Sequence, residues 1–301
     1  MVNNVIELFC AVDDFCIELQ KKLLAPSLSE SSICQRRRSP GVCESEIMTI
    51  VIAFQRSGYR TFKQYYIAIQ VAWKSLFPGL PSYNRFIELM PRVLFQMLLF
   101  LYSHKGKKTG ISFLDSTPIR VCNIKRAKRN KVFQNVATFG KSTIGWFYGF
   151  KLHIVINEVG ELLGFRITTA NTDDRAPVED LTKDIIGKCM ADKGYLSKAL
   201  FEKLFQRGLH LVTSIRSNMK KKMLPIIDKI LLRKRSLIET VNDQLKNVCH
   251  AEHSRHRSVS NFMINIVSAL ISYARQEKKP QMNFDFSELF KMNNEGLPIL
   301  I

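Results

Sequence analysis

Three acidic residues stand at positions where their carboxylates can act together. Asp115 follows the apolar segment 111–114, Asp192 follows a second short apolar segment, and Glu239 lies inside a long amphipathic segment. The ends of neighbouring strands converge at one edge of an α/β sheet, and a helix can cover that edge. Three carboxylates gathered there could bind a hard divalent cation such as Mg²⁺, because such cations prefer oxygen ligands.

Segment 236–249 would present Glu239 together with two cations. At about 100° per residue, one stripe of this helix carries Arg235, Glu239, Asn242 and Lys246. A separate apolar face for packing consists of Leu237, Val241, Leu245 and Val248. Two interpretations stay open: an ordinary solvated Arg–Glu ion pair worth about 0.3 kcal/mol, or a carboxylate whose neighbouring cations grip an anionic substrate.

The first third of the chain predicts helices only. Apolar residues recur at helical spacing over residues 5–23, and Thr61 and Gln64 fit a capping box at the start of another helix. Ser82 can cap a further helix that reaches about residue 102, with a kink at Pro91. We therefore expect residues 1–108 to form an all-helical domain.

Strand patterns begin after the basic segment 105–108. The predicted strands cover 111–114, 148–157, 162–169, a short segment that ends at Asp192, and 209–215. The predicted helices cover a segment from about Ala176, which Asp173 or Asp174 can cap, then 197–206 and 236–249. Strands followed by alternating strand and helix predict an α/β domain, residues 109–277, with a mixed sheet and flanking helices. Residues 278–301 are expected to form a C-terminal tail.

The chain is strongly basic, with a formal net charge of +19. Residues 1–100 hold 11 Lys and Arg against 8 Asp and Glu, so most of the positive charge lies further on. The stretch between Ser116 and Asn157 has no acidic residue and contains Lys125, Arg126, Lys128, Arg129, Lys131 and Lys151, with Phe133, Phe139, Trp146 and Phe147 interleaved. Nucleic acid is the expected partner, because cations suit phosphates and aromatic rings suit sugar and base faces.

Several other classes of protein are disfavoured. The longest strongly apolar stretch, 93–103, is shorter than the about 20 residues of a membrane-spanning helix, and the N-terminal residues lack the features of a secretory signal. Seven cysteines without a C-x-x-C pair favour reduced thiols. The cluster of Cys249, His250, His253 and His256 lacks the paired spacing of a zinc site. We expect a cytoplasmic protein with no membrane partner.

Four short segments, in this order along the chain, resemble the DDE-class transposases of bacterial insertion sequences. They are 113–118 (FLDSTP), 149–153 (GFKLH), 191–195 (ADKGY) and 235–239 (RSLIE), the last followed by Lys246. The resemblance covers roughly residues 110–260. It implies a ribonuclease-H-like mixed sheet with flanking helices, and a transposase that cuts and joins the DNA ends of its own insertion sequence.

The same resemblance assigns roles to individual residues. Asp115, Asp192 and Glu239 would be the catalytic triad that binds two Mg²⁺ ions, with Mn²⁺ as a possible substitute, and Arg235 and Lys246 would grip the DNA end. The family signature Tyr-x2-Arg-x3-Glu-x6-Lys is matched in spacing, with Leu232 in the place of the Tyr. Further DNA contacts are expected from Lys125, Arg126, Lys128, Arg129, Lys131, Lys151, Arg255 and Arg257.

The implied partners are double-stranded DNA, both terminal inverted repeats and target DNA, and further copies of the chain on paired DNA ends. Domain 1–108 would bind DNA ends or mediate dimerisation. The implied location is the bacterial cytoplasm, at the nucleoid. Two alternatives stay open: a ribonuclease-H-like endonuclease that does not integrate DNA, and a catalytically silent DNA-binding protein.

Overall fold

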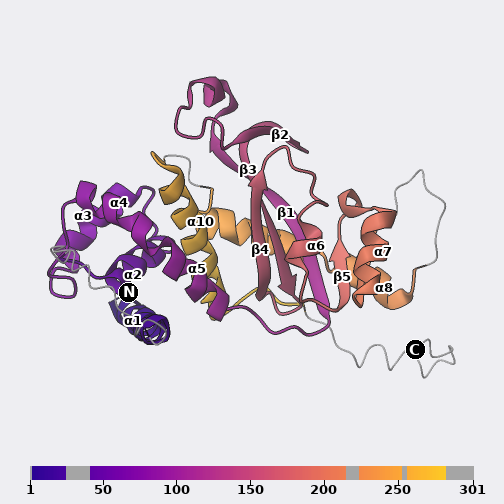
Figure 1. Ribbon diagram of the computed structural model, residues 1–301, viewed down its shortest axis with the longest axis horizontal. Coiled ribbons are helices and arrows are strands. Elements are labelled where there is room, and N and C mark those ends of the chain that lie inside the picture. Colours follow the sequence, from indigo (N-terminus) through magenta and orange to yellow (C-terminus); the bar gives the residue numbers. More distant parts are fainter. Residues whose placement is uncertain (1, 25–40, 215–223, 253–255, 283–301) are drawn as a thin grey trace.

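The computed structural model describes residues 2–24, 41–214, 224–252 and 256–282 (Figure 1). Helices gather at the N-terminal end of the molecule, and a mixed sheet with its own helices forms the rest. Arg255 and most of the predicted tail, 278–301, lie outside the described residues. The mixed α/β class with a preceding helical region is confirmed.

The N-terminal region is helical, as predicted. Its elements are α1 (Val2–Leu24), α2 (Glu44–Phe54), α3 (Phe62–Ala72), α4 (Tyr83–Leu89), η1 (Met90–Val93) and α5 (Leu94–Ser103). The hydroxyls of Thr61 and Ser82 cap α3 and α4, and Pro91 lies in the 3₁₀ turn η1 that separates α4 from α5. Helix α2 was not predicted, because it is buried on nearly every side and has no polar face to reveal its period.

Helix α10 (Val259–Ala274) returns to this region from the far end of the chain (Figure 1). It packs against α5 and α2, and the buried Gln55 Nε2 of the chain after α2 donates to Asn265 Oδ1 at 3.1 Å. One apolar core consequently joins the N-terminal helices, α10 and one face of the sheet. Because α10 contributes to both parts, the boundaries 1–108, 109–277 and 278–301 stay a prediction.

The helical run α4–η1–α5 is longer than the apolar stretch noted in the sequence. Among the described residues, Tyr83–Ser103 alone has the length and composition to cross a membrane, with 39% of its apolar window buried. The run packs against α1, α2 and α10. A core helix of a globular protein passes the same test of length and composition, so this run is weak evidence for a membrane span.

The sheet has six strands. They are β1 (Ile111–Cys122), β2 (Thr138–Ser142), β3 (Gly145–Asn157), β4 (Leu162–Thr169), β5 (Gly187–Ala191) and β6 (Leu209–Thr213). The order is β2-β3-β1-β5-β6, and β4 also pairs with β3. Strands β1 to β4 pair antiparallel, whereas β5 and β6 continue the sheet in parallel with β1. The predicted turn at Gly160 joins β3 to β4 and has a positive φ of 73°.

Strand β1 corrects one expectation. It was predicted to end before Asp115, but it continues through Asp115 and Pro118 to Cys122. Strand β5 pairs with β1 only over residues 111–113, so the β5 side of β1 is an unpaired edge beyond that point. Proline is tolerated at such an edge because its missing N–H is not needed there.

Helices cover both faces of the sheet. Besides α10, the helices of this part are α6 (Val178–Leu181), η3 (Lys193–Tyr195), α7 (Lys198–Gln206), α8 (Ile226–Arg233), α9 (Ser236–Asp243) and η4 (Gln244–Val248). A further turn, η2 (Ile124–Arg129), lies on a segment that projects beyond the sheet. Helices α9 and α10 share the main core, while α6 and α7 enclose a second core on the opposite face.

Two predicted helices are shorter than expected. The helix expected from Ala176 begins at Val178 and has 4 residues, since Asp173 pairs with Arg175 and does not cap it. The helix expected over 236–249 changes from α to π geometry at Gln244. That change turns Val248 out to 45% exposure, although helical spacing had placed it on the packing face.

Candidate active site

The end of β5 brings Asp192 to the level of Asp115. Strands β1 and β5 pair in parallel over residues 111–113 and 188–190. Continued by two residues, this register sets Asp115 opposite Asp192, which is the first residue after β5. The negative charge of Asp192 acts on the pKa of Asp115, as expected of neighbours. The place where the two strands separate therefore carries two acidic side chains.

Asp115 is in an environment that opposes its negative charge. Burial raises the pKa of its carboxyl to about 6, and the charges of Asp192 and Glu239 act in the same direction. A hydrogen bond from the backbone of Ser116 and the charge of Arg235 act against this rise. A bound cation would relieve the repulsion between these carboxylates.

Helix α9 holds a polar side chain against Asp115. Asn242 Nδ2 donates to Asp115 Oδ2 at 3.0 Å, across 127 residues of sequence. The Asn242 side chain is 7% exposed, and its Oδ1 is buried with no hydrogen-bond partner among the described residues. The helix is anchored by apolar neighbours that include Ile238 and Val241, both fully buried. The spacing placed Asn242 on the stripe of Glu239, but the sequence did not reveal its contact.

Glu239 points to Arg235 in this structure. The two side chains form an ion pair at 2.6 Å, and that of Glu239 is 57% exposed. Lys246 instead lies 3.8 Å from Glu252, whose other oxygen lies 3.6 Å from Arg120. Burial lowers the pKa of Lys246, and the charges of Glu252 and Asp115 oppose this. The stripe predicted for the helix is thus divided between two ion pairs, and Glu252 was not foreseen.

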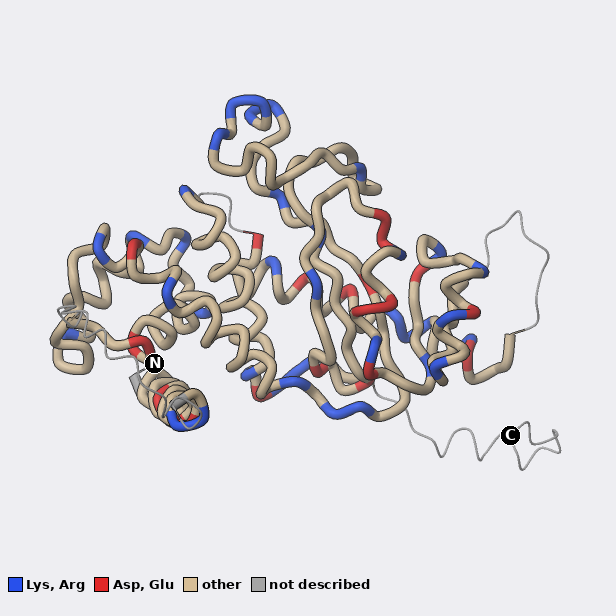
Figure 2. Tube along the Cα trace, viewed as in Figure 1, with Lys and Arg blue, Asp and Glu red and all other residues tan. Residues whose placement is uncertain are grey.

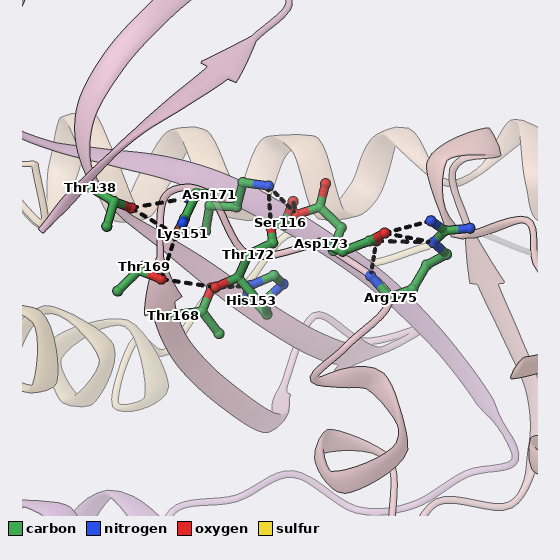
Figure 3. A network of polar contacts seen from close by, with 11 residues as sticks. Ser116, Thr138, Lys151, His153, Thr168, Thr169, Asn171, Thr172, Asp173 and Arg175 are labelled. Atoms are coloured by element: carbon green, nitrogen blue, oxygen red, sulfur yellow. Dashed lines mark hydrogen bonds and ion pairs between the residues drawn. The ribbon is translucent and has the colours of Figure 1, made fainter.

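A polar network lies on the face of β1 that carries Ser116, opposite to the face that carries Asp115 (Figure 3). Lys151 Nζ on β3 lies 3.0 Å from Asp174 Oδ1 and donates to the Thr172 carbonyl oxygen at 2.8 Å. Ser116 Oγ donates to the same Asp174 oxygen at 2.9 Å. The adjacent His153 is fully buried, and its Nε2 bonds to Thr168 Oγ1 at 2.8 Å. Asp174 was expected to be a turn or cap residue, and instead it ties β1 to β3.

Residues 105–259 match a family model described as the transposase DDE domain. The match spans more than half of the 301-residue chain and contains every acidic residue discussed above. The chain belongs to the transposase DDE-domain family. The resemblance of the four sequence segments to DDE-class transposases is thereby confirmed, and the protein is a DNA transposase by family.

Two solved structures are similar to this transposase in outline. A piggyBac transposase synaptic complex with hairpin DNA aligns with 98% of this chain and 80% of its own, at 12% identity and a TM-score of 0.47. The Mos1 strand transfer complex aligns with 90% of this chain and 87% of its own, at 8% identity and a TM-score of 0.23. Both scores are too low to bear on the arrangement of the site. No curated protein matches the chain.

The residues predicted from the sequence to bind metal have donors of the right chemistry for a divalent cation. Asp115, Asp192 and Glu239 would supply carboxylate oxygens, and the Oδ1 of Asn242, which has no hydrogen-bond partner among the described residues, is a further acceptor beside Asp115. They are not gathered into a finished metal site, because no three His, Cys, Asp or Glu side chains in the described ranges lie close enough together to hold an ion. The ion pair with Arg235 accounts for the orientation of Glu239.

The residues predicted to bind DNA fall into different surroundings (Figure 2). The exposed ones are Lys125, Arg126, Lys128, Arg129, Lys131 and Arg257. Lys151 is held by Asp174 and is 15% exposed, and Arg255 lies outside the described residues. Leu232, in the place of the signature Tyr, packs partly buried against the main core. Phe133 and Phe147 are each 2% exposed, so they are core residues and do not face a ligand.

Proposed function

We propose that this transposase cleaves DNA at the ends of its mobile element and joins those ends to target DNA, using Asp115, Asp192 and Glu239. The observations that carry the proposal are that Asp192 follows β5 where β1 and β5 separate, with its charge acting on Asp115, and that α9 is bound to Asp115 through Asn242. Membership of the DDE-domain family supports the reaction class. Metal-dependent phosphoryl transfer needs carboxylates in such an arrangement.

Asp115, Asp192 and Glu239 would hold two Mg²⁺ or Mn²⁺ ions, which when bound activate the attacking oxygen and stabilise the leaving one. Asn242 keeps Asp115 oriented through its 3.0 Å hydrogen bond. Arg235 lies beside Glu239 and can turn from that carboxylate to a DNA phosphate, and Lys246 can do the same from Glu252. Both cations would neutralise charge that develops on the phosphate in the transition state.

Double-stranded DNA is the proposed substrate, as terminal repeats in the cleavage step and as target in the joining step. The net charge of +19 supports an anionic polymer as partner. We further propose that copies of the chain assemble on paired DNA ends in the cytoplasm, and that residues 1–108 bind DNA ends or mediate that assembly. The phosphate contacts would come from the exposed cations that precede β2.

The test is Mg²⁺-dependent cleavage of a labelled duplex that carries the repeat flanking the gene in its own locus. Wild type should nick the duplex at the repeat boundary, and Glu239→Gln should not. Glu202→Gln on α7 is a matched control, since Glu202 is also 57% exposed and pairs with a Lys four residues away. The control should cleave like wild type.

Joining is measured next with an unlabelled target duplex. Products in which the labelled repeat duplex is joined to the target duplex would support the transposase reaction. Released ends without joined products would support the endonuclease alternative. Binding without cleavage by folded wild type would support a silent DNA-binding protein. Equal cleavage by wild type and Glu239→Gln would remove Glu239 from the proposed triad.

A further inference from the structure

The β2–β3 hairpin has one packed face and a second face that is open only toward its tip. Gly140 and Phe147 lie opposite each other on the packed face, where a Cβ at Gly140 would collide with the carbonyl oxygen of Ala170. Phe139 lies opposite Tyr148 and Lys141 lies opposite Trp146 on the other face. Tyr148 is itself only 6% exposed and its hydroxyl donates to the Phe133 carbonyl oxygen at 3.0 Å, so the exposed part of the second face is at the tip, at Lys141 and Trp146.

Large apolar side chains stand in solvent on the open side. Trp146 is 61% exposed, Phe139 is 44% exposed, and Ile144 at the turn is 84% exposed. Trp73, the other tryptophan of the chain, is 8% exposed. The hairpin forms the upper end of the sheet in Figure 1, away from the N-terminal helices. An aromatic ring with this exposure is accessible to a stacking partner.

Positive charge precedes this hairpin in the chain. Lys125, Arg126, Lys128, Arg129 and Lys131, on or directly after η2, are all exposed, and none pairs with a carboxylate in the part of the chain that the structure describes. Figure 2 shows their positive charge gathered on the projecting segment. The segment is anchored by Phe133, whose ring centroid lies 5.2 Å from that of Phe262. Cations beside an aromatic tip complement phosphates beside bases.

The hairpin tip lies at a definable distance from the acidic site. Asp115 pairs with Ile154 in β3, and Trp146 precedes Ile154 by eight residues of the same strand. At ~3.3 Å per residue this separation is about 26 Å. A duplex that runs along β3, with a rise of ~3.4 Å per base pair, covers that length in about seven or eight base pairs.

We propose that the hairpin tip is a base-stacking grip on the DNA substrate, in which Trp146 and Ile144 insert at an unstacked base step about seven or eight base pairs from the scissile phosphate. The cations of η2 hold the phosphates on either side. This inference rests on the proposed function, because it takes the scissile phosphate to lie at Asp115. Apolar side chains that enter a base step between phosphate-bound cations are a known way to hold bent DNA.

The test measures tryptophan fluorescence while the repeat duplex is added without divalent cations, so that no cleavage occurs. Stacking should quench the emission of wild type, and Trp146→Phe should lose the quench because Trp73 is buried. Duplexes with 2-aminopurine at successive positions should show a Trp146-dependent change that is largest seven or eight pairs from the boundary. Trp146→Ala should weaken binding at least tenfold, and Trp146→Phe should weaken it less.

Phe205→Ala is the matched control, since Phe205 on α7 is 59% exposed and lies far from η2 in the sequence. It should bind DNA like wild type. The inference would be overturned if saturating DNA did not quench the tryptophan emission of wild type. It would also be overturned if the emission were quenched without DNA, to an extent that increases with protein concentration. Cleavage without the quench would reject only the grip, whereas the quench without cleavage would reject only the proposed reaction.

Discussion

The two sides of β1 carry carboxylates in opposite situations. On one side, Asp115 is partly buried near two other acidic residues, and this burial raises its pKa to about 6. On the other side, Asp174 receives Lys151 at 3.0 Å and Ser116 at 2.9 Å. This difference indicates two roles for a carboxylate. Asp174, which pairs with a lysine and a hydroxyl of the protein, stabilises the fold, whereas Asp115, whose acidic neighbours oppose its negative charge, is suited to bind a cation.

The largest expected effect separates these two carboxylates. Asp115→Asn should reduce cleavage by more than about 10³-fold, because the proposed metal site loses a ligand. Its free energy of unfolding at pH 7 should stay equal or rise, since burial disfavours the charged form of Asp115. Asp174→Asn should keep cleavage within a few-fold and lower the free energy of unfolding by ~1–2 kcal/mol.

Single-turnover cleavage and urea denaturation of the two variants check this pair of outcomes. The comparison fails if Asp174→Asn abolishes cleavage at unchanged stability, or if Asp115→Asn unfolds the protein while its folded fraction still cleaves DNA. Asp192→Asn should behave like Asp115→Asn.

A smaller effect concerns His153, on the same side as Asp174. Burial lowers its pKa from 6.5 to about 4, with Lys151 and Arg166 acting in the same direction and Asp174 against. As the pH falls from 6.5 to 4, the unfolded chain takes up this proton before the folded one does, so the free energy of unfolding declines. The His153 contribution to this decline should approach ~3 kcal/mol, at 1.36 kcal/mol per unit of pKa.

Urea denaturation of wild type and His153→Gln at pH 7, 6, 5 and 4 measures the contribution as a difference. The variant should lose less stability than wild type over this range. Parallel curves for the two proteins would show that His153 takes up a proton in the folded state at its ordinary pKa.

The smallest effect tests the link between α9 and Asp115. Asn242→Ala removes the hydrogen bond to Asp115 Oδ2, and we expect cleavage to fall about tenfold, the loss of one such bond. Asn247→Ala is the control, because Asn247 is exposed and bonds only locally to Asp243. Single-turnover rates at saturating DNA check it, and equal rates for the two variants would exclude a positioning role for Asn242.

The sequence predicted helices in the N-terminal region, every strand of the sheet except β2, and the strand–turn–strand at Gly160, because periodicity and turn chemistry are local. It did not predict α2, which lacks a polar face, or the continuation of β1 through Pro118, which depends on where β5 stops pairing. It placed Val248 on the packing face because regular helical spacing does not anticipate a π turn.

The sequence by itself determined which residues could do chemistry: the three acidic residues, the cations near them and the basic stretch before β2. Their types and spacing within single elements are enough for that. Only the tertiary structure decided that Asn242 donates a hydrogen bond to Asp115 and that Lys151 pairs with Asp174. It also decided that Trp146 is exposed while Phe147 is buried. These outcomes depend on contacts between elements far apart in the chain, and hydrogen bonding and burial there are not encoded in local periodicity.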